Sequence, residues 1–442
     1  MPKILIKHAD AITLDRPDEV LRGTDIAIAD GVIQAVGALP DDFVPDEVLD
    51  ATGQVVMPGF FNAHTHAPMT LVRGWAEDLP LDRWFNERIW VAESALTEED
   101  VYWGAALAAA EMIRSGTVGF ADHYFWMDRM AEVVEQSGLR ATLAWCVFGL
   151  GADQEIGGTT LDLTVDFVQR WQGAAGGRIR TVLGPHSPYV CSPDFLSRVA
   201  ERAAALGVGV HLHVAESQEQ VDNSLAEHGR TPVAHLAHLG LFDVPVIAAH
   251  CIYVNGEDLA ILAEKGVNVA SCTGCYMKLG MGVPPLPDTL ERGINVALGT
   301  DGPASNNDLD MLQEARLTAL MHKNAHQEPQ LLPGDLVLRL ATQNGARAMG
   351  FPRSGAIAPG RAADLVVLDF HQPHLHPRHN LIANVIYAAK AGDVRHVMVD
   401  GRWLLRDREL LTLDEERIIY EAERHARRMV DADLRVVREY RG

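Results

Sequence analysis

Residues 57–66 read MPGFFNAHTH, a short apolar run that closes on two histidines. A continuous apolar run punctuated by Gly59 is typical of a strand buried in a parallel sheet. His64 and His66 are two residues apart, so on a strand both imidazoles point to the same face and can bind one ion together. An H-x-H pair alone is weak support for a metal site, and an ordinary core or surface pair stays open.

Seven further apolar runs follow, separated by longer segments of helical spacing. The eight candidate strands are MPGFFNAH, TVGFAD, RATLAWCV, RTVLGPH, VGVHLHVAE, VIAAHC, NVASC and INVALGTD. Strands that alternate with helices are typical of a parallel sheet, and eight such units are what a (β/α)₈ barrel requires. We therefore expect a TIM barrel over residues 58–353.

Both ends of the chain have a different pattern. Residues 1–57 contain short alternating strands, with an Asp30-Gly31 pair that is typical of a hairpin turn. Similar β-rich runs return at 364–370, 396–405 and 408–413. We expect residues 1–57 and 354–442 to form one small β-sandwich domain, with a solvated surface helix over roughly 414–438.

Composition and charge exclude several classes of protein. The chain has 442 residues and a formal charge of −22, which argues against nucleic acid or an anionic membrane as partner. No run approaches the ~18 apolar residues of a membrane span, and the N-terminus lacks the pattern of a secretory signal. Five cysteines, an odd and sparse set, indicate reduced thiols. We expect a cytoplasmic protein.

Polar residues close most of the candidate barrel strands, at the face where barrel enzymes carry their chemistry. They are His64, His66, His186, His213, Glu216, His250 and Asp301. One or two could be satisfied core histidines, but a convergent ring is hard to explain as packing. Asp301 would be costly to bury without a cation or a hydrogen-bond donor. Three imidazoles and one carboxylate suit Zn²⁺ or Fe²⁺.

His211 competes with His213 for the role of ligand, because the two have the same parity on their strand. We favour His213, which lies nearer the carboxyl end of the strand, with Glu216 three residues further on. His211 is then expected to be a buried structural imidazole.

Four segments, PGFFNAHTH, HVAES, AAHC and LGTDGPASNN, resemble the amidohydrolase superfamily in their order and spacing. The likeness covers essentially the whole chain and lies in the branch of cytosine, adenine-nucleoside and triazine deaminases. Within that branch it is nearest to the methylthioadenosine and S-adenosylhomocysteine deaminases. The resemblance implies a hydrolytic deaminase of an aminated N-heterocycle, with an adenosine-type nucleoside as substrate and ammonia as product. It also implies a homo-oligomer.

The resemblance assigns roles to the polar residues at the strand ends. One divalent cation, Zn²⁺ or alternatively Fe²⁺, is held by His64, His66, His213 and Asp301. Asp301 also takes a proton from the attacking water, and His250 orients the attacking oxygen. Glu216 protonates the ring nitrogen and then the leaving amine. The segment RTVLGPHSPY has no lysine of the kind that bridges two ions in two-metal relatives, which favours a single ion.

The resemblance also implies contacts to the substrate. Trp84 stacks on the base, Glu93 holds the ribose hydroxyls, and His186 reaches the substrate from the fourth strand. Two alternatives stay open, because Trp84 can simply be core and Glu93 can cap the helix that begins near Leu96.

Two departures from the family pattern concern the substrate's identity. Trp145 stands where the relatives place an arginine used at the nucleoside tail, and Cys272 to Met277 replace an Asn-Pro-x-Ser-Asn pattern. Cys272 and Cys275 are expected to be two reduced thiols lining or underlying the pocket. A free purine, a pterin or a triazine is therefore an alternative substrate, acted on by deamination, dealkylamination or dechlorination. Cleavage of a cyclic amide and a non-catalytic scaffold are less consistent with Glu216 and the complete set of ligands.

Overall fold

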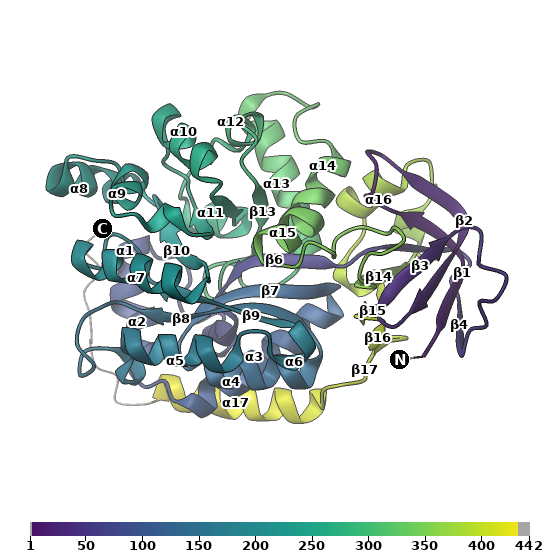
Figure 1. Ribbon diagram of the computed structural model, residues 1–442, viewed down its shortest axis with the longest axis horizontal. Coiled ribbons are helices and arrows are strands. Elements are labelled where there is room, and N and C mark those ends of the chain that lie inside the picture. Colours follow the sequence, from purple (N-terminus) through teal and green to yellow (C-terminus); the bar gives the residue numbers. More distant parts are fainter. Residues whose placement is uncertain (1, 432–442) are drawn as a thin grey trace.

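The computed structural model describes residues 2–431, and its largest unit is a barrel of eight parallel strands. The strands are β6 (Phe60–Thr65), β7 (Thr117–Tyr124), β8 (Arg140–Val147), β9 (Ile179–Pro185), β10 (Val210–Val214), β11 (Val246–His250), β12 (Asn268–Ser271) and β13 (Val296–Leu298). They pair in chain order from β6 to β13, with helices around the outside (Figure 1). The predicted (β/α)₈ barrel is confirmed.

Hydrogen bonds near the carboxyl ends of β6 and β13 join the first and last strands of the barrel. The backbone amide of Asp301 donates to the carbonyl of His64 at 3.0 Å. The carboxamide of Asn62 bonds both the hydroxyl and the amide of Thr300, at 2.7 and 3.0 Å. A Cβ at position 299 would lie 2.7 Å from the His64 nitrogen, so only glycine lets β13 approach β6 this closely. This approach places Asp301 next to the two histidines of β6.

Helices connect the strands and cover the barrel. The α-helices are α1 (Leu81–Arg83), α2 (Trp90–Glu93), α3 (Glu98–Arg114), α4 (Met127–Ser137), α5 (Leu161–Trp171), α6 (Ala174–Gly177), α7 (Pro193–Leu206), α8 (Gln218–His228), α9 (Pro232–His238), α10 (Gly256–Lys265), α11 (Thr273–Leu279), α12 (Leu286–Glu291), α13 (Met311–His326), α14 (Gly334–Arg339), α15 (Gly345–Ala348), α16 (Leu381–Tyr387) and α17 (Glu415–Asp431). Short 3₁₀ turns are η1 (Ala67–Val72), η3 (Ile156–Gly158), η4 (Leu241–Asp243), η6 (Pro373–Leu375) and η7 (Ala391–Asp393). Two π-helical turns are η2 (Trp84–Ile89) and η5 (Leu340–Asn344). No described helix is long and apolar enough to cross a bilayer.

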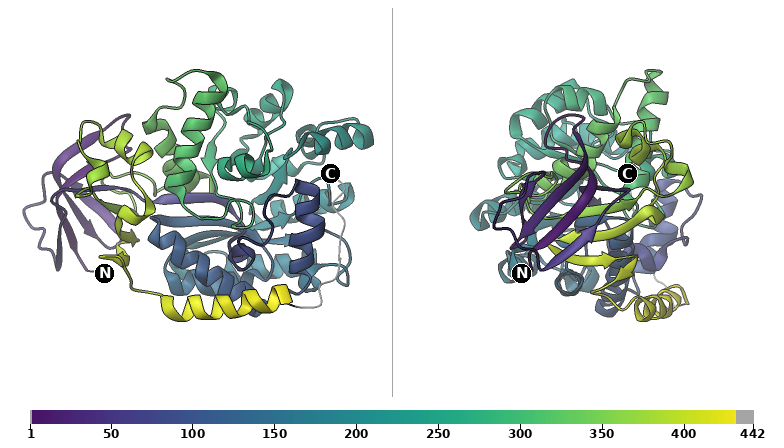
Figure 2. Two further views of the ribbon diagram at one scale, coloured as in Figure 1. Left: turned by 180° about the vertical axis from the view of Figure 1, so that it is seen from behind. Right: turned by 90° about the vertical axis from the view of Figure 1, so that its right-hand side faces the viewer.

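Strands from both chain ends form a second sheet at one end of the molecule (Figures 1 and 2). They are β1 (Ile4–Ile12), β2 (Val20–Ala29), β3 (Val32–Val36), β4 (Glu47–Asp50), β5 (Gln54–Pro58), β14 (Leu365–Asp369), β15 (Val394–Val399), β16 (Arg402–Arg406) and β17 (Glu409–Leu410). The antiparallel pair β5 and β14 joins the two halves. The predicted hairpin is confirmed: Asp30 and Gly31, both at positive φ, form the two-residue turn between β2 and β3.

Two predicted segments differ in detail from the structure. The run MPGFFNAH divides at Gly59, because Met57 pairs within the small sheet whereas the barrel strand begins at Phe60. The predicted terminal helix is α17, which packs on α3 along the side of the barrel (Figure 2). The last part of that prediction, 432–438, lies outside the described residues.

Candidate metal centre and active site

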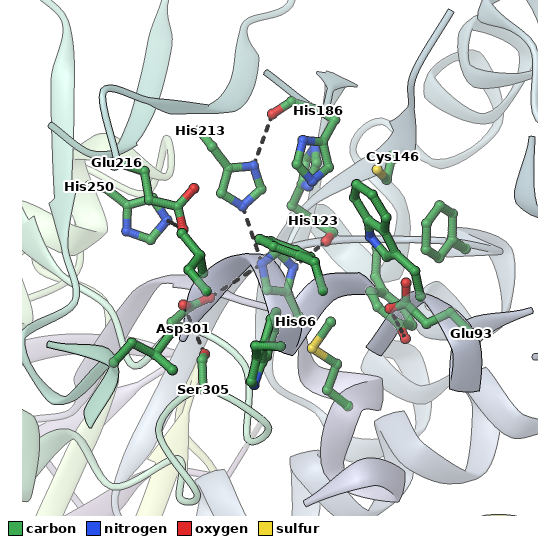
Figure 3. A pocket seen from close by; sticks show the side chains of 18 of the residues that line it. His66, Glu93, His123, Cys146, His186, His213, Glu216, His250, Asp301 and Ser305 are labelled. Atoms are coloured by element: carbon green, nitrogen blue, oxygen red, sulfur yellow. Dashed lines mark hydrogen bonds and ion pairs between the residues drawn. The ribbon is translucent and has the colours of Figure 1, made fainter. Parts of the chain in front are cut away.

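The four predicted ligands come together at the carboxyl ends of the barrel strands. His64 and His66 lie on β6, His213 on β10, and Asp301 follows β13. Asp301 Oδ1 lies 3.4 Å from His64 Nε2 and 3.3 Å from His66 Nε2. His213 Nε2 lies 3.3 Å from His66 Nε2 (Figure 3). The distances place four potential donor atoms around one small space.

Burial makes this arrangement of side chains costly in free energy when no ion is bound between them. His64 Nε2 and Asp301 Oδ1 are both buried and have no hydrogen-bond partner among the described residues. An unpaired buried polar atom costs about 1–3 kcal/mol. A cation bound between them would satisfy both atoms, so the residues present fit a metal ion of the kind that prefers nitrogen and carboxylate ligands.

The outer nitrogen of each imidazole is already engaged. His66 Nδ1 donates to the carbonyl of His123 at 2.6 Å, and His213 Nδ1 donates to the carbonyl of His186 at 2.9 Å. His64 Nδ1 lies 2.9 Å from Nε2 of His211. Bonds of this type fix the ring orientation and direct the second nitrogen toward a metal. Asp301 is held in the same way, because Ser305 Oγ donates to its Oδ2 at 2.9 Å.

The electrostatics of the site favour neutral imidazoles and an ionised aspartate. Burial lowers the pKa of His64 well below its ordinary value and lowers the pKa of His213 and of His250 to about 4. Burial alone would raise the pKa of Asp301, but the neighbouring imidazoles hold it well below its ordinary value. Neutral histidines and a carboxylate are the protonation states that metal binding requires.

Glu216 and His250, the predicted proton-handling residues, lie beside the predicted ligands (Figure 3). Glu216 Oε1 is 3.9 Å from His250 Nε2, and Glu216 Oε2 accepts a 2.7 Å bond from the hydroxyl of Tyr189. Burial raises the pKa of Glu216, which suits a carboxyl group that holds and delivers a proton. His250 ends β11 at a φ of 76°, a left-handed conformation that costs energy and is often found at functional sites.

Of the four predicted ligands, all except the deeper His64 border one cavity, with an empty volume of about 530 Å³ including its mouth. The predicted substrate contacts Trp84, Glu93 and His186 border the same cavity. The remaining lining residues are Met69, Leu81, Phe85, Trp90, His123, Tyr124, Phe125, Cys146, Phe148, Glu216, His250, Leu279 and Ser305. The cavity therefore joins a polar floor to largely aromatic walls.

The positions of Trp84 and Glu93 bear on the alternatives left open by the sequence, a core tryptophan and a helix-capping glutamate. Trp84 is 3% exposed, so it is both buried and part of the cavity wall. Glu93 does not cap α3, because Thr97 and Asp100 form a reciprocal capping box there. The Glu93 carboxylate instead accepts a 2.8 Å bond from the hydroxyl of Tyr124. His186 stacks on Phe148, with ring centroids 4.8 Å apart.

Trp145 does not border the cavity. It points outward from β8 and packs edge-on against Phe167 of α5. Its neighbours Cys146 and Phe148 border the cavity on this side. Successive residues of a strand alternate between faces, so Trp145 lies on the face of β8 that points away from the cavity.

The thiols of Cys272 and Cys275 are free and fully buried at the start of α11. Neither borders the cavity, so they underlie the site and do not line it.

Several residues of the site were absent from the sequence prediction, among them His123, Tyr189 and Ser305. His123 is the second-last residue of β7 and borders the cavity, Tyr189 bonds Glu216, and Ser305 bonds Asp301. His123 could have been found, since it follows TVGFAD directly and is another histidine at a strand end. The other two lie in loops, where strand periodicity gives no signal.

Comparisons with known proteins identify the family of the chain. The sequence model of the Amidohydrolase family matches residues 55–404. A 5-methylthioadenosine/S-adenosylhomocysteine deaminase of Pelotomaculum thermopropionicum is 45% identical over 98% of this chain and 100% of its own length. A 5'-deoxyadenosine deaminase of Methanosarcina mazei is 45% identical over 97% of this chain and 99% of its own length.

Two solved structures share the fold. An adenosine deaminase from Xanthomonas campestris with bound zinc superposes with a TM-score of 0.92 at 34% identity, covering 98% of this chain and 99% of that one. An atrazine chlorohydrolase from Arthrobacter aurescens, in complex with zinc, has a TM-score of 0.85 at 27% identity, covering 96% and 100%.

Proposed function

The chain belongs to the amidohydrolase family and is a hydrolase of carbon–nitrogen bonds other than peptide bonds, and we propose that it deaminates adenosine-type nucleosides at the described site. Methylthioadenosine, S-adenosylhomocysteine and adenosine are the first candidates. The observation that carries the proposal is the position of Glu216 and His250 beside the four predicted ligands, at the floor of one cavity. Loss of an amine needs a proton donor at that place.

In this proposal His64, His66, His213 and Asp301 hold a single divalent cation, with Zn²⁺ as first candidate and Fe²⁺ as second. Two observations support it: the unpartnered atoms of His64 and Asp301, and the zinc in the two similar structures. When bound, such a cation acts as a Lewis acid that makes water nucleophilic at neutral pH.

The protein's own groups then move the protons. Asp301 accepts a proton from the attacking water, while Ser305 keeps the carboxylate oriented. His250 holds the attacking oxygen by a hydrogen bond. Glu216, whose raised pKa favours the protonated form, donates its proton to the ring nitrogen beside the reacting carbon. The resulting carboxylate then takes the proton of the hydroxyl added to that carbon and delivers it to the leaving amine, so that the C–N bond breaks as the carbonyl forms. The proton held by Asp301 returns to Glu216 as the products leave. The products are ammonia and a ring carbonyl.

The cavity walls support a nucleoside substrate. Trp84 offers an aromatic surface for the base, and the Glu93 carboxylate offers an acceptor for ribose hydroxyls. Phe125 and Phe148 stack 6.2 Å apart on the same wall. This apolar side suits an uncharged 5' substituent such as a methylthio group.

The test is ammonia release from a panel of adenosine, methylthioadenosine, S-adenosylhomocysteine, 5'-deoxyadenosine, guanine, pterins and aminotriazines. Metal analysis is expected to give about one equivalent per chain. Glu216→Gln should keep the metal and lose about 10²–10⁴-fold in kcat. Glu219→Gln, an exposed glutamate three residues away, is the matched control and should keep full activity. Full activity of Glu216→Gln, or no ammonia from any nucleoside, would contradict the proposal.

A second candidate is hydrolysis of a free purine, pterin or triazine. The aromatic walls and the likeness to the atrazine chlorohydrolase favour it. Glu93→Gln separates the two candidates, because it should lower kcat/KM for a nucleoside and leave that for a free heterocycle unchanged.

A further inference from the structure

One of the three predicted histidine ligands differs from the other two in how its ring is held. His66 and His213 donate their Nδ1 protons to backbone carbonyls, which any sequence would supply. The Nδ1 of His64 instead faces a side chain, Nε2 of His211, at 2.9 Å. Both rings are fully buried, so no solvent competes for this bond.

The bond constrains the proton positions on both rings. A neutral imidazole carries one proton, so it is a donor at one nitrogen and an acceptor at the other. His64 can offer Nε2 to a cation only when its proton lies on Nδ1. That proton needs an acceptor, and His211 Nε2 supplies one when His211 carries its own proton on Nδ1.

His211 is a poor choice for packing alone. It lies on β10 between Val210 and Leu212, among inward positions that barrels usually fill with apolar side chains. Its Nδ1 is buried and has no hydrogen-bond partner among the described residues. An apolar side chain would avoid leaving that atom unpaired, so packing does not account for an imidazole here.

We propose that His211 is a positioning residue that holds His64 in the tautomer and ring orientation able to bind the cation. It acts through His64 and does not touch the substrate or the ion. The inference rests on the metal site proposed above, and it adds a role to the buried structural imidazole that the sequence predicts at His211.

The test compares two substitutions of His211 by the affinity of the purified protein for Zn²⁺, measured by competition with a chromophoric chelator. His211→Phe keeps a ring and removes the acceptor. His211→Gln keeps an acceptor, since its carbonyl oxygen replaces Nε2. We expect zinc affinity to fall about 10–100-fold in His211→Phe and by less than about threefold in His211→Gln. His322→Phe, which replaces another fully buried histidine on α13, is the control and should leave zinc affinity unchanged.

A second readout follows geometry instead of affinity. In the Co²⁺-substituted proteins, the visible absorption spectrum should change in His211→Phe and stay like that of the parent protein in His211→Gln. If the phenylalanine ring prevents folding, His211→Leu removes the acceptor with a smaller side chain and decides the same question.

The outcomes separate this inference from the proposed function. A parent protein that binds no zinc overturns the proposed metal site itself. A parent that binds about one equivalent, with a His211→Phe variant that folds and binds zinc equally tightly, overturns only the role of His211. Equal losses in the Phe and Gln variants would likewise reduce His211 to a packing residue.

Discussion

Replacing Asp364 by asparagine removes the charge from a buried ion pair between the barrel and the small sheet. Arg140 opens β8, and Asp364 directly precedes β14. Arg140 Nε donates to Asp364 Oδ2 at 2.7 Å, and its Nη2 donates to Oδ1 at 3.0 Å. The Asp364 side chain is fully buried, and the pKa of Arg140 is raised by the two nearby carboxylates against the effect of burial.

The magnitude follows from what the guanidinium loses. Breaking a buried pair by removing one partner costs about 3–5 kcal/mol, because a charge stays buried without compensation. Asp400 also accepts a bond from Arg140 and still compensates part of that charge. We therefore expect Asp364→Asn to lower the free energy of unfolding by about 3 kcal/mol, at the low end of that range.

The assay is urea denaturation at pH 7, followed by circular dichroism. Glu87→Gln is the control, because it removes a carboxylate from the exposed pair Arg83–Glu87. Such pairs contribute about 0–1 kcal/mol. If Asp364→Asn lowers the free energy of unfolding no more than the control does, the reasoning that burial strengthens the contribution of this bidentate pair is refuted.

Three further predictions concern pH, the proton relay and the metal. Burial lowers the pKa of His322 to about 4 from an unfolded value near 6.5, so the native state loses stability as the pH falls below 6.5, by about 2 kcal/mol at pH 5 for this single group. The urea midpoint of His322→Phe should therefore decrease less between pH 7.5 and pH 5 than that of the parent protein. Tyr189→Phe removes a hydrogen-bond donor that lowers the pKa of Glu216, so the limb of the pH–rate profile that reports this carboxyl group should move to higher pH, and kcat/KM should fall about tenfold or more. An unchanged profile would show that the Tyr189–Glu216 bond takes no part in proton transfer. Chelation of the bound ion should lower the melting temperature, and Zn²⁺ at about 100 times its Kd should restore about 2.7 kcal/mol; a melting curve insensitive to both treatments would contradict the metal site.

Much of the barrel could be predicted from the sequence because its strands are buried on both faces. The run RATLAWCV coincides with β8 at both ends, Arg140 and Val147. Strands of this kind read as continuous apolar runs, and a histidine or aspartate at the end of such a run is conspicuous. The predicted ligands were found through that contrast.

The same burial hides other features. Every residue of β8 is buried, so hydrophobicity does not reveal that Cys146 faces the cavity and Trp145 faces α5. The division of MPGFFNAH at Gly59 is hidden for the same reason, because both sheets accept apolar residues. The contact between His64 and His211 joins β6 to β10 across the interior of the barrel, which no local pattern records.

The pairing of β5 with β14 has a consequence for the order of events during synthesis. Pro58 lies opposite Leu365, so β5 leaves the ribosome roughly 300 residues before its partner. At a synthesis rate of about 5–20 residues per second, β5 lacks its partner β14 for a time on the order of tens of seconds. The barrel, whose strands pair in chain order, can assemble during this interval, and β5 keeps an unpaired backbone edge until β14 has been synthesised.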